Sequence, residues 1–175
     1  PSPFAPRPIV AMNSGRFVYS SGEDYRLTLS SGPSGVPRVI TWHGWKKPLT
    51  DELVASVRAH YEAGWEEVRE VDPELVENIM RATYSPDILP DTLPVLRSVF
   101  PLDDGRLWVS RFRPINQIWM EEDSWHLLSP EGHPIARLAL PPESKMVGAR
   151  RDHVVVVTRD SLDLETLRVF RVQEA

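Results

Sequence analysis

The residues best suited to binding chemistry in this chain lie in two irregular segments, at 43–47 and 111–123. Arginine and tryptophan are enriched where proteins bind partners, because each combines a large contact surface with hydrogen-bond donors. Both segments supply such residues, next to a histidine and a carboxylate. We predict a binding site formed by His43, Trp45, Arg111, Arg113, Trp119 and Glu121, with Trp42, Lys46 and Lys47 close by.

A purely structural interpretation of the same residues stays open. In this interpretation the segment 112–123 packs beneath helices formed by residues 43–94, and Trp119 belongs to the core. Arg111 and Arg113 then form ion pairs with acidic side chains of those helices. The sequence by itself allows both interpretations.

Motifs that would indicate an enzyme are absent from the sequence. It has no Gly-x-Ser-x-Gly elbow, no His-Glu-x-x-His pair and no glycine-rich phosphate loop. The five histidines are scattered, and cysteine does not occur, so a thiolate nucleophile or metal ligand is excluded. Acidic residues at 103–104 and 160–165 offer oxygen ligands for calcium, but their spacing is more typical of turns. We therefore expect no catalytic residues, no metal and no cofactor.

Composition and charge exclude several kinds of partner. The chain has 175 residues, 41% of them hydrophobic, which is enough for one domain with a buried core. The net charge of -5 is concentrated at 43–91, where eleven acidic residues outnumber five basic ones. The sequence has no basic stripe for nucleic acid, and no stretch reaches the roughly 18 apolar residues that a membrane span requires.

The elements that must position the candidate residues are mostly short strands. Alternating apolar and polar residues, separated by turns rich in glycine, proline, aspartate and serine, predict eleven strands in three groups. The groups lie at 9–12, 16–20, 25–30 and 37–42; at 95–100, 106–111, 124–129 and 135–140; and at 145–149, 153–158 and 166–172. A tight turn followed by a buried strand recurs in all three groups, at 13–20, 103–110 and 151–158.

Residues 43–94 interrupt the strands with a helical pattern. Thr50 is a candidate N-cap, and apolar residues follow at every fourth position from 53 to 65. Asp72 and Pro73 stand in the favoured cap-then-proline order and start a second helix. The sequence therefore predicts an insertion of two amphipathic helices.

Four-stranded groups of about 40 residues with the same order of elements favour propeller blades over a β-sandwich. We predict a mainly β fold: a partial β-propeller with blades at 8–42, 95–140 and 145–172, the last incomplete, and a helical insertion at 43–94. In a propeller blade, the link between the second and third strands emerges on the same face as the connection to the next blade. The insertion and the segment 112–123 should therefore share one face.

Two strings resemble the blades of bacterial six-bladed β-propellers of the NHL and TolB-like kind: DGRLWV at 104–109 and SPEGHPIARLALP at 129–141. The ending at 159–172 resembles their C-terminal blade. The resemblance implies an exported, extracytoplasmic protein of which this chain is the C-terminal half. Because a closed ring needs at least four blades, the remaining blades or a second copy would have to complete it.

The function expected from these features is recognition without catalysis, with the helix-capped face binding a protein, peptide or carbohydrate. The alternative is a propeller-type hydrolase or lactonase whose catalytic residues lie mostly in blades absent from this chain. The first strands of the three groups contain no acid and no histidine, which disfavours that alternative. A structural module without a ligand is a third possibility.

Overall fold

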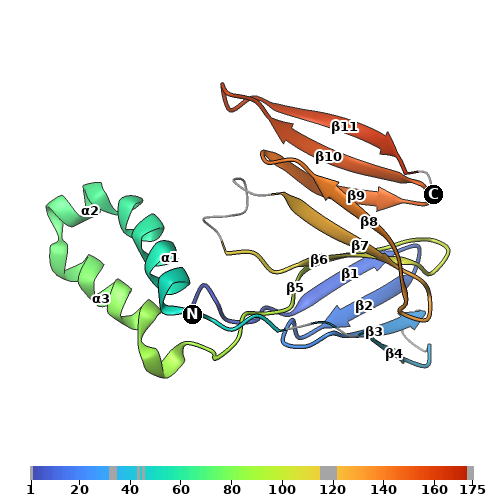
Figure 1. Cartoon of the computed structure of the whole chain (residues 1–175), viewed down its shortest axis with the longest axis horizontal. Coiled ribbons are helices and arrows are strands. Elements are labelled where there is room, and N and C mark those ends of the chain that lie inside the picture. The colour runs from blue at the N-terminus through green and yellow to red at the C-terminus, as the bar shows by residue number, and fades with distance from the viewer. Residues whose placement is uncertain (1, 32–34, 43, 45, 115–121, 173–175) are drawn as a thin grey trace.

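The computed structural model describes residues 2–31, 35–42, 44, 46–114 and 122–172 and shows a mainly β protein (Figure 1). Within these residues, eleven strands form three antiparallel sheets, and three α-helices lie to one side of the sheets. The prediction of a mainly β chain with eleven strands in three groups is confirmed.

Each sheet pairs its strands in chain order. The first sheet contains β1 (Ile9–Asn13), β2 (Arg16–Ser20), β3 (Arg26–Ser31) and β4 (Arg38–Thr41). The second sheet contains β5 (Leu96–Pro101), β6 (Leu107–Arg111), β7 (Asp123–Leu128) and β8 (Pro134–Leu140). The third sheet contains β9 (Ser144–Arg150), β10 (His153–Arg159) and β11 (Glu165–Arg171). Neighbouring strands are antiparallel because the links between them return the chain beside the strand that it has just left.

The three sheets are stacked, and a separate hydrophobic core fills each of the two interfaces. Between the first and second sheets the buried residues include Val18, Leu27, Ile40, Val99, Leu107 and Val109. Between the second and third sheets they include Trp108, Trp125, Leu127, Met146, Val154 and Val156. The second sheet is therefore apolar on both faces, as expected for a sheet covered on both sides.

The insertion between β4 and β5 contains α1 (Asp51–Ala63), α2 (Glu66–Val71) and α3 (Pro73–Tyr84), followed by the 3-10 turn η1 (Pro86–Ile88). Thr50 and Asp72 cap α1 and α3, because their side-chain oxygens accept hydrogen bonds from backbone N–H groups three residues later. The prediction of two helices was wrong, because the described insertion contains three α-helices. The short α2 has six residues, none of them buried, and its two valines form too short an apolar pattern to reveal a helix.

A third core lies among the helices and includes a residue from the N-terminal segment. Phe4 is fully buried together with Val57 of α1 and Val76 and Met80 of α3. The N-terminal segment is thereby held against the insertion before it enters β1. None of the helices in the described part of the chain is long and apolar enough to cross a membrane.

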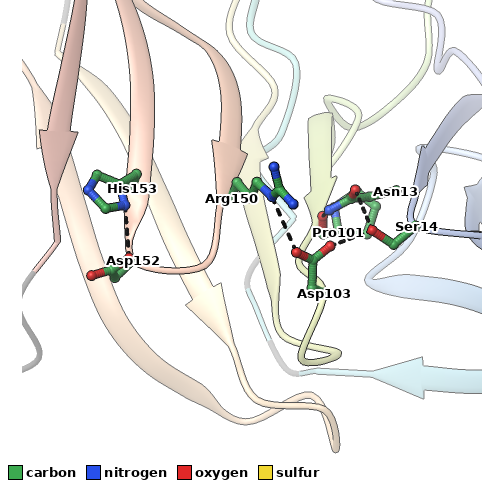
Figure 2. Close-up of polar contacts among 7 residues, drawn as sticks. All are labelled: Asn13, Ser14, Pro101, Asp103, Arg150, Asp152 and His153. Carbon is green, nitrogen blue, oxygen red and sulfur yellow. Dashed lines mark hydrogen bonds and ion pairs between the residues drawn. The ribbon is translucent and has the colours of Figure 1, made fainter.

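Polar contacts also join the three sheets at equivalent turns (Figure 2). Asp103 follows β5 and accepts a hydrogen bond of 2.6 Å from the hydroxyl of Ser14, which follows β1. Arg150, at the end of β9, lies 3.5 Å from the same carboxylate. Asn13 Nδ2 donates to the carbonyl oxygen of Pro101 at 2.8 Å. The turns of neighbouring sheets are thus aligned along one edge of the stack.

The resemblance to six-bladed NHL and TolB-like propellers was wrong. In the described residues the sheets form an open stack of two four-stranded units and one three-stranded unit, with no closed ring. The strings at 104–109 and 129–141 encode a glycine turn, a buried strand and a hairpin, and such local features do not specify how many sheets assemble or how they close. The extracytoplasmic location inferred from the same resemblance stays a prediction.

A candidate ligand pocket beside the helices

A pocket of about 380 Å³ lies where the insertion meets the second sheet. One wall comes from the ends of the insertion and from α1, with Lys47, Leu53 and Leu93 among its residues. The opposite wall follows β6 and precedes β7, and it includes Phe112 and Glu122. Residues from both segments that the sequence singled out therefore line one cavity.

Backbone hydrogen bonds fix the position of the insertion relative to the sheets. Its two ends are joined by Leu49 N–H to Asp91 O at 3.0 Å and by Leu93 N–H to Lys47 O at 2.8 Å. Val95 N–H then donates to Gly22 O at 3.0 Å, which links the end of the insertion to the first sheet. The pocket wall is therefore a paired stem and not a free loop.

A buried ion-pair cluster supports the other wall. Asp123, the first residue of β7, is 1% exposed and lies 2.8 Å from Arg97 and 3.1 Å from Arg113. The register of β5 against β6 shifts between Leu96 and Ser98, where Arg97 lies. Because the interior stabilises a charge only when it is paired, this cluster fixes the course of the chain on both sides of the segment 115–121.

The charged groups that line the pocket differ in their partners. Arg113 pairs with Asp123, and Glu122 pairs with Arg137 at 3.0 Å. Within the described residues, Lys47 and Arg111 have no ion-pair partner. Among the described lining residues, the charges without an ion-pair partner are therefore positive, and they lie next to apolar side chains.

His126 on β7 adds no charge to this region at neutral pH. Its burial lowers the pKa below the ordinary value, and the positive charges of Arg111 and Arg137 lower it further. A histidine with a lowered pKa is neutral at pH 7. The positive charge near the pocket therefore comes from lysine and arginine.

Of the six predicted site residues, two are in the described part of the chain. Arg111 and Arg113 both line the pocket, and Arg111 is the more exposed of the two. His43, Trp45, Trp119 and Glu121 lie outside the described residues. The structural interpretation placed Arg113 against the acids of the helices, whereas among the described residues it pairs with Asp123 of the second sheet.

Sequence reasoning missed Asp123 and Arg97, because their pairing joins β7 to β5 over 26 positions. The one feature of the sequence that could have indicated this buried ion pair is an aspartate at the start of an apolar strand. In the described residues, no group of three or more histidine, aspartate or glutamate side chains is placed to hold a metal ion.

The fold and the pocket define a mainly β protein of three stacked sheets with a ligand-sized cavity beside a helical insertion. No protein-family model matches the chain, and no curated protein matches it in sequence.

Proposed function

We propose that this chain is a non-enzymatic recognition protein whose pocket beside the helices binds a peptide segment that carries a carboxylate. The observation behind the proposal is the combination of Lys47 and Arg111, both without an ion-pair partner in the described residues, with an apolar lining. Cations of this kind attract a carboxylate, and arginine can hold it through two parallel hydrogen bonds.

Size and lining support a peptide ligand. A volume of about 380 Å³ is within the usual range for ligand sites, which extends from about 300 to 1,000 Å³. Leu53, Leu93 and Phe112 offer apolar surface to a side chain next to the carboxylate. A neutral carbohydrate would use hydrogen-bonding groups and leave the two positive charges without a counterpart.

We also propose that the three sheets are repeats of one unit of the propeller-blade type, arranged as an open stack. In support, each sheet is a simple meander, and each pairs its first strand with its second across a short turn. The turns before β2 and β6 both place a glycine in the left-handed region, at φ 76° for Gly15 and 93° for Gly105.

The test of the peptide proposal is a peptide library screened against the wild-type chain, followed by titration of the selected peptides. The variant Lys47→Glu/Arg111→Glu should reduce binding by about 100-fold, because two attractive contacts become repulsive. The control Lys145→Glu/Arg168→Glu has the same net charge, and its two substituted positions are exposed and outside the pocket lining. It should bind like the wild type.

Two outcomes would refute the proposal. One is a screen that selects only peptides without acidic side chains, whose binding does not change when the C-terminus is amidated. The other is an equal loss of binding in both double variants, which would show a general charge effect. Far-UV circular dichroism of each variant separates loss of binding from loss of fold.

A further inference from the structure

Equivalent positions in the first two sheets face the same way but differ in burial. When Gly15 of the first sheet is matched with Gly105 of the second, Phe17 and Tyr19 match Leu107 and Val109. Leu107 and Val109 face the first sheet and are 1% and 3% exposed. Phe17 and Tyr19 are 38% and 49% exposed. We call the side of a sheet that points toward the preceding sheet its back face, and the opposite side its forward face.

In the third sheet, equivalent positions again point toward the preceding sheet. Val154 and Val156 match Leu107 and Val109, and both are buried on the back face against the second sheet. Val155 matches Trp108, which is buried on the forward face of the second sheet. No sheet of the described residues lies opposite the forward face of the third sheet, and Val155 is only half-buried.

Both uncovered faces at the ends of the stack are apolar. The back face of the first sheet consists of Val10, Met12, Phe17, Tyr19 and Val39, together with Thr28, Ser30 and Arg26. The forward face of the third sheet has Val155 and Val157 paired with Val169 and Leu167, and the last two are 65% and 66% exposed. Large side chains of this kind grouped on one exposed surface indicate an interaction site.

We propose that these two faces are the two halves of one interface, and that the back face of the first sheet packs on the forward face of the third sheet in a second copy of this chain. The proposed contact continues the pattern of the interfaces within the chain. Each of the two internal cores joins a forward face to a back face, and neither joins two like faces. Within the described residues, the stack has one uncovered face of each type.

The charges around the forward face fit this arrangement. Arg159 pairs with Glu165 at 3.0 Å at one end of the strands, and Arg171 pairs with Asp152 at 2.8 Å at the other. The apolar residues lie between these pairs, and Lys145 of β9 adds an exposed positive charge beside Val157. Because β9 is an edge strand, this charge belongs to the rim, and the face has an apolar centre and a polar rim, as protein interfaces do. On the back face Arg26 lies 3.7 Å from Asp24. Because the contact joins different surfaces, it is head-to-tail.

Cross-linking tests which faces meet. The chain contains no cysteine, so Tyr19→Cys and Val169→Cys each introduce a single thiol. The two variants, one of them isotope-labelled, are mixed and treated with a short bismaleimide. Linked pairs should contain one copy of each variant, and each variant alone should give little product. Efficient linking within either variant alone, without the mixed product, would overturn the head-to-tail contact.

The native mass tests the association itself. The 19.9 kDa chain should sediment as a dimer or a larger assembly. The highest concentration tested is about 100 µM, roughly the weak end of specific association. A chain that stays monomeric up to this concentration would overturn the proposal. Leu167→Asp/Val169→Asp should raise the dissociation constant by about 100-fold or more, because two carboxylates would be buried without partners. Tyr19→Asp, on the back face of the first sheet, should also raise the dissociation constant.

Val71→Asp is the matched control, because Val71 is 86% exposed on α2, away from both faces. It should associate like the wild type. If Tyr19→Asp and the double variant on β11 both keep the wild-type mass while folded by circular dichroism, the proposal is wrong. Using both faces keeps the test decisive if one of these variants fails to fold.

Discussion

The hydroxyl of Ser14 donates a hydrogen bond of 2.6 Å to Asp103, and this bond joins turns 89 residues apart in neighbouring sheets (Figure 2). The bond lowers the pKa of the Asp103 carboxyl, and Arg150 lowers it further. A carboxyl with a lowered pKa in the folded state stabilises the fold above its ordinary pKa, and the contribution is lost as the pH falls through the folded-state pKa.

The first prediction concerns this pH dependence. Asp103→Asn should be less stable than the wild type at pH 7, and the difference should shrink as the pH falls below about 4, the ordinary range of aspartate. Urea unfolding between pH 7 and pH 3 measures it. Asp87→Asn is the control, since the Asp87 side chain has no hydrogen-bond or ion-pair partner among the described residues. A difference that does not change with pH would contradict the assignment.

The second prediction concerns the buried cluster around Asp123. Asp123→Asn should lower the free energy of unfolding by about 3–5 kcal/mol, because it leaves Arg97 and Arg113 without their buried carboxylate. Glu77→Gln removes the same kind of charge from a pair with Arg81 that is exposed on α3, and it should cost less than about 0.5 kcal/mol. Equal losses in the two variants would show that burial of the cluster is unimportant.

The third prediction separates backbone strain from packing at two glycines. Gly132 has φ 95°, and a Cβ there would lie 2.1 Å from the Ile40 side chain of the first sheet. Gly15 has φ 76°, and a Cβ there would meet nothing within 4 Å. Gly15→Ala should cost about 1–2 kcal/mol from the left-handed conformation alone. Gly132→Ala should cost clearly more, as measured by thermal unfolding, because it also pushes the first and second sheets apart.

The fourth prediction concerns Tyr84, which lies in the core of the helices. Burial, with a smaller effect from Tyr61, raises the pKa of Tyr84 from 10.0 to about 12. The unfolded chain therefore loses this proton at lower pH than the folded one, so stability should fall as the pH rises from 10 towards 12. Tyr84→Phe lacks this loss, and denaturation curves at pH 8 and pH 11 compare the two proteins.

At neutral pH the same variant has a second expected effect. The Tyr84 hydroxyl has no hydrogen-bond partner among the described residues. Removing it should raise the free energy of unfolding by about 1 kcal/mol, because a buried polar group without a partner is costly. A loss of stability at pH 7 would reveal a hydrogen bond that the hydroxyl makes.

The candidate site divides between what local pattern could predict and what it could not. Arg111 and Arg113 were expected to be site residues, and both line the pocket. Their different environments were not foreseeable, because the partner of Arg113 is a residue of β7 and Arg111 is left facing the cavity. The contribution of Lys47 to the same cavity depends on how the stem of the insertion pairs with itself.

The strands, the turns and the caps of the helices follow from local sequence. Each of these depends on residues a few positions apart: the alternation in β7, the glycine turn at Gly105, and the hydroxyl of Thr50 over Leu53 N–H. The stacking of the sheets, the choice of the covered face on each, and the contact between Asp123 and Arg97 emerge only in the folded chain. These features depend on contacts between distant segments, whose energies arise only when the sheets pack together, so no local pattern encodes them.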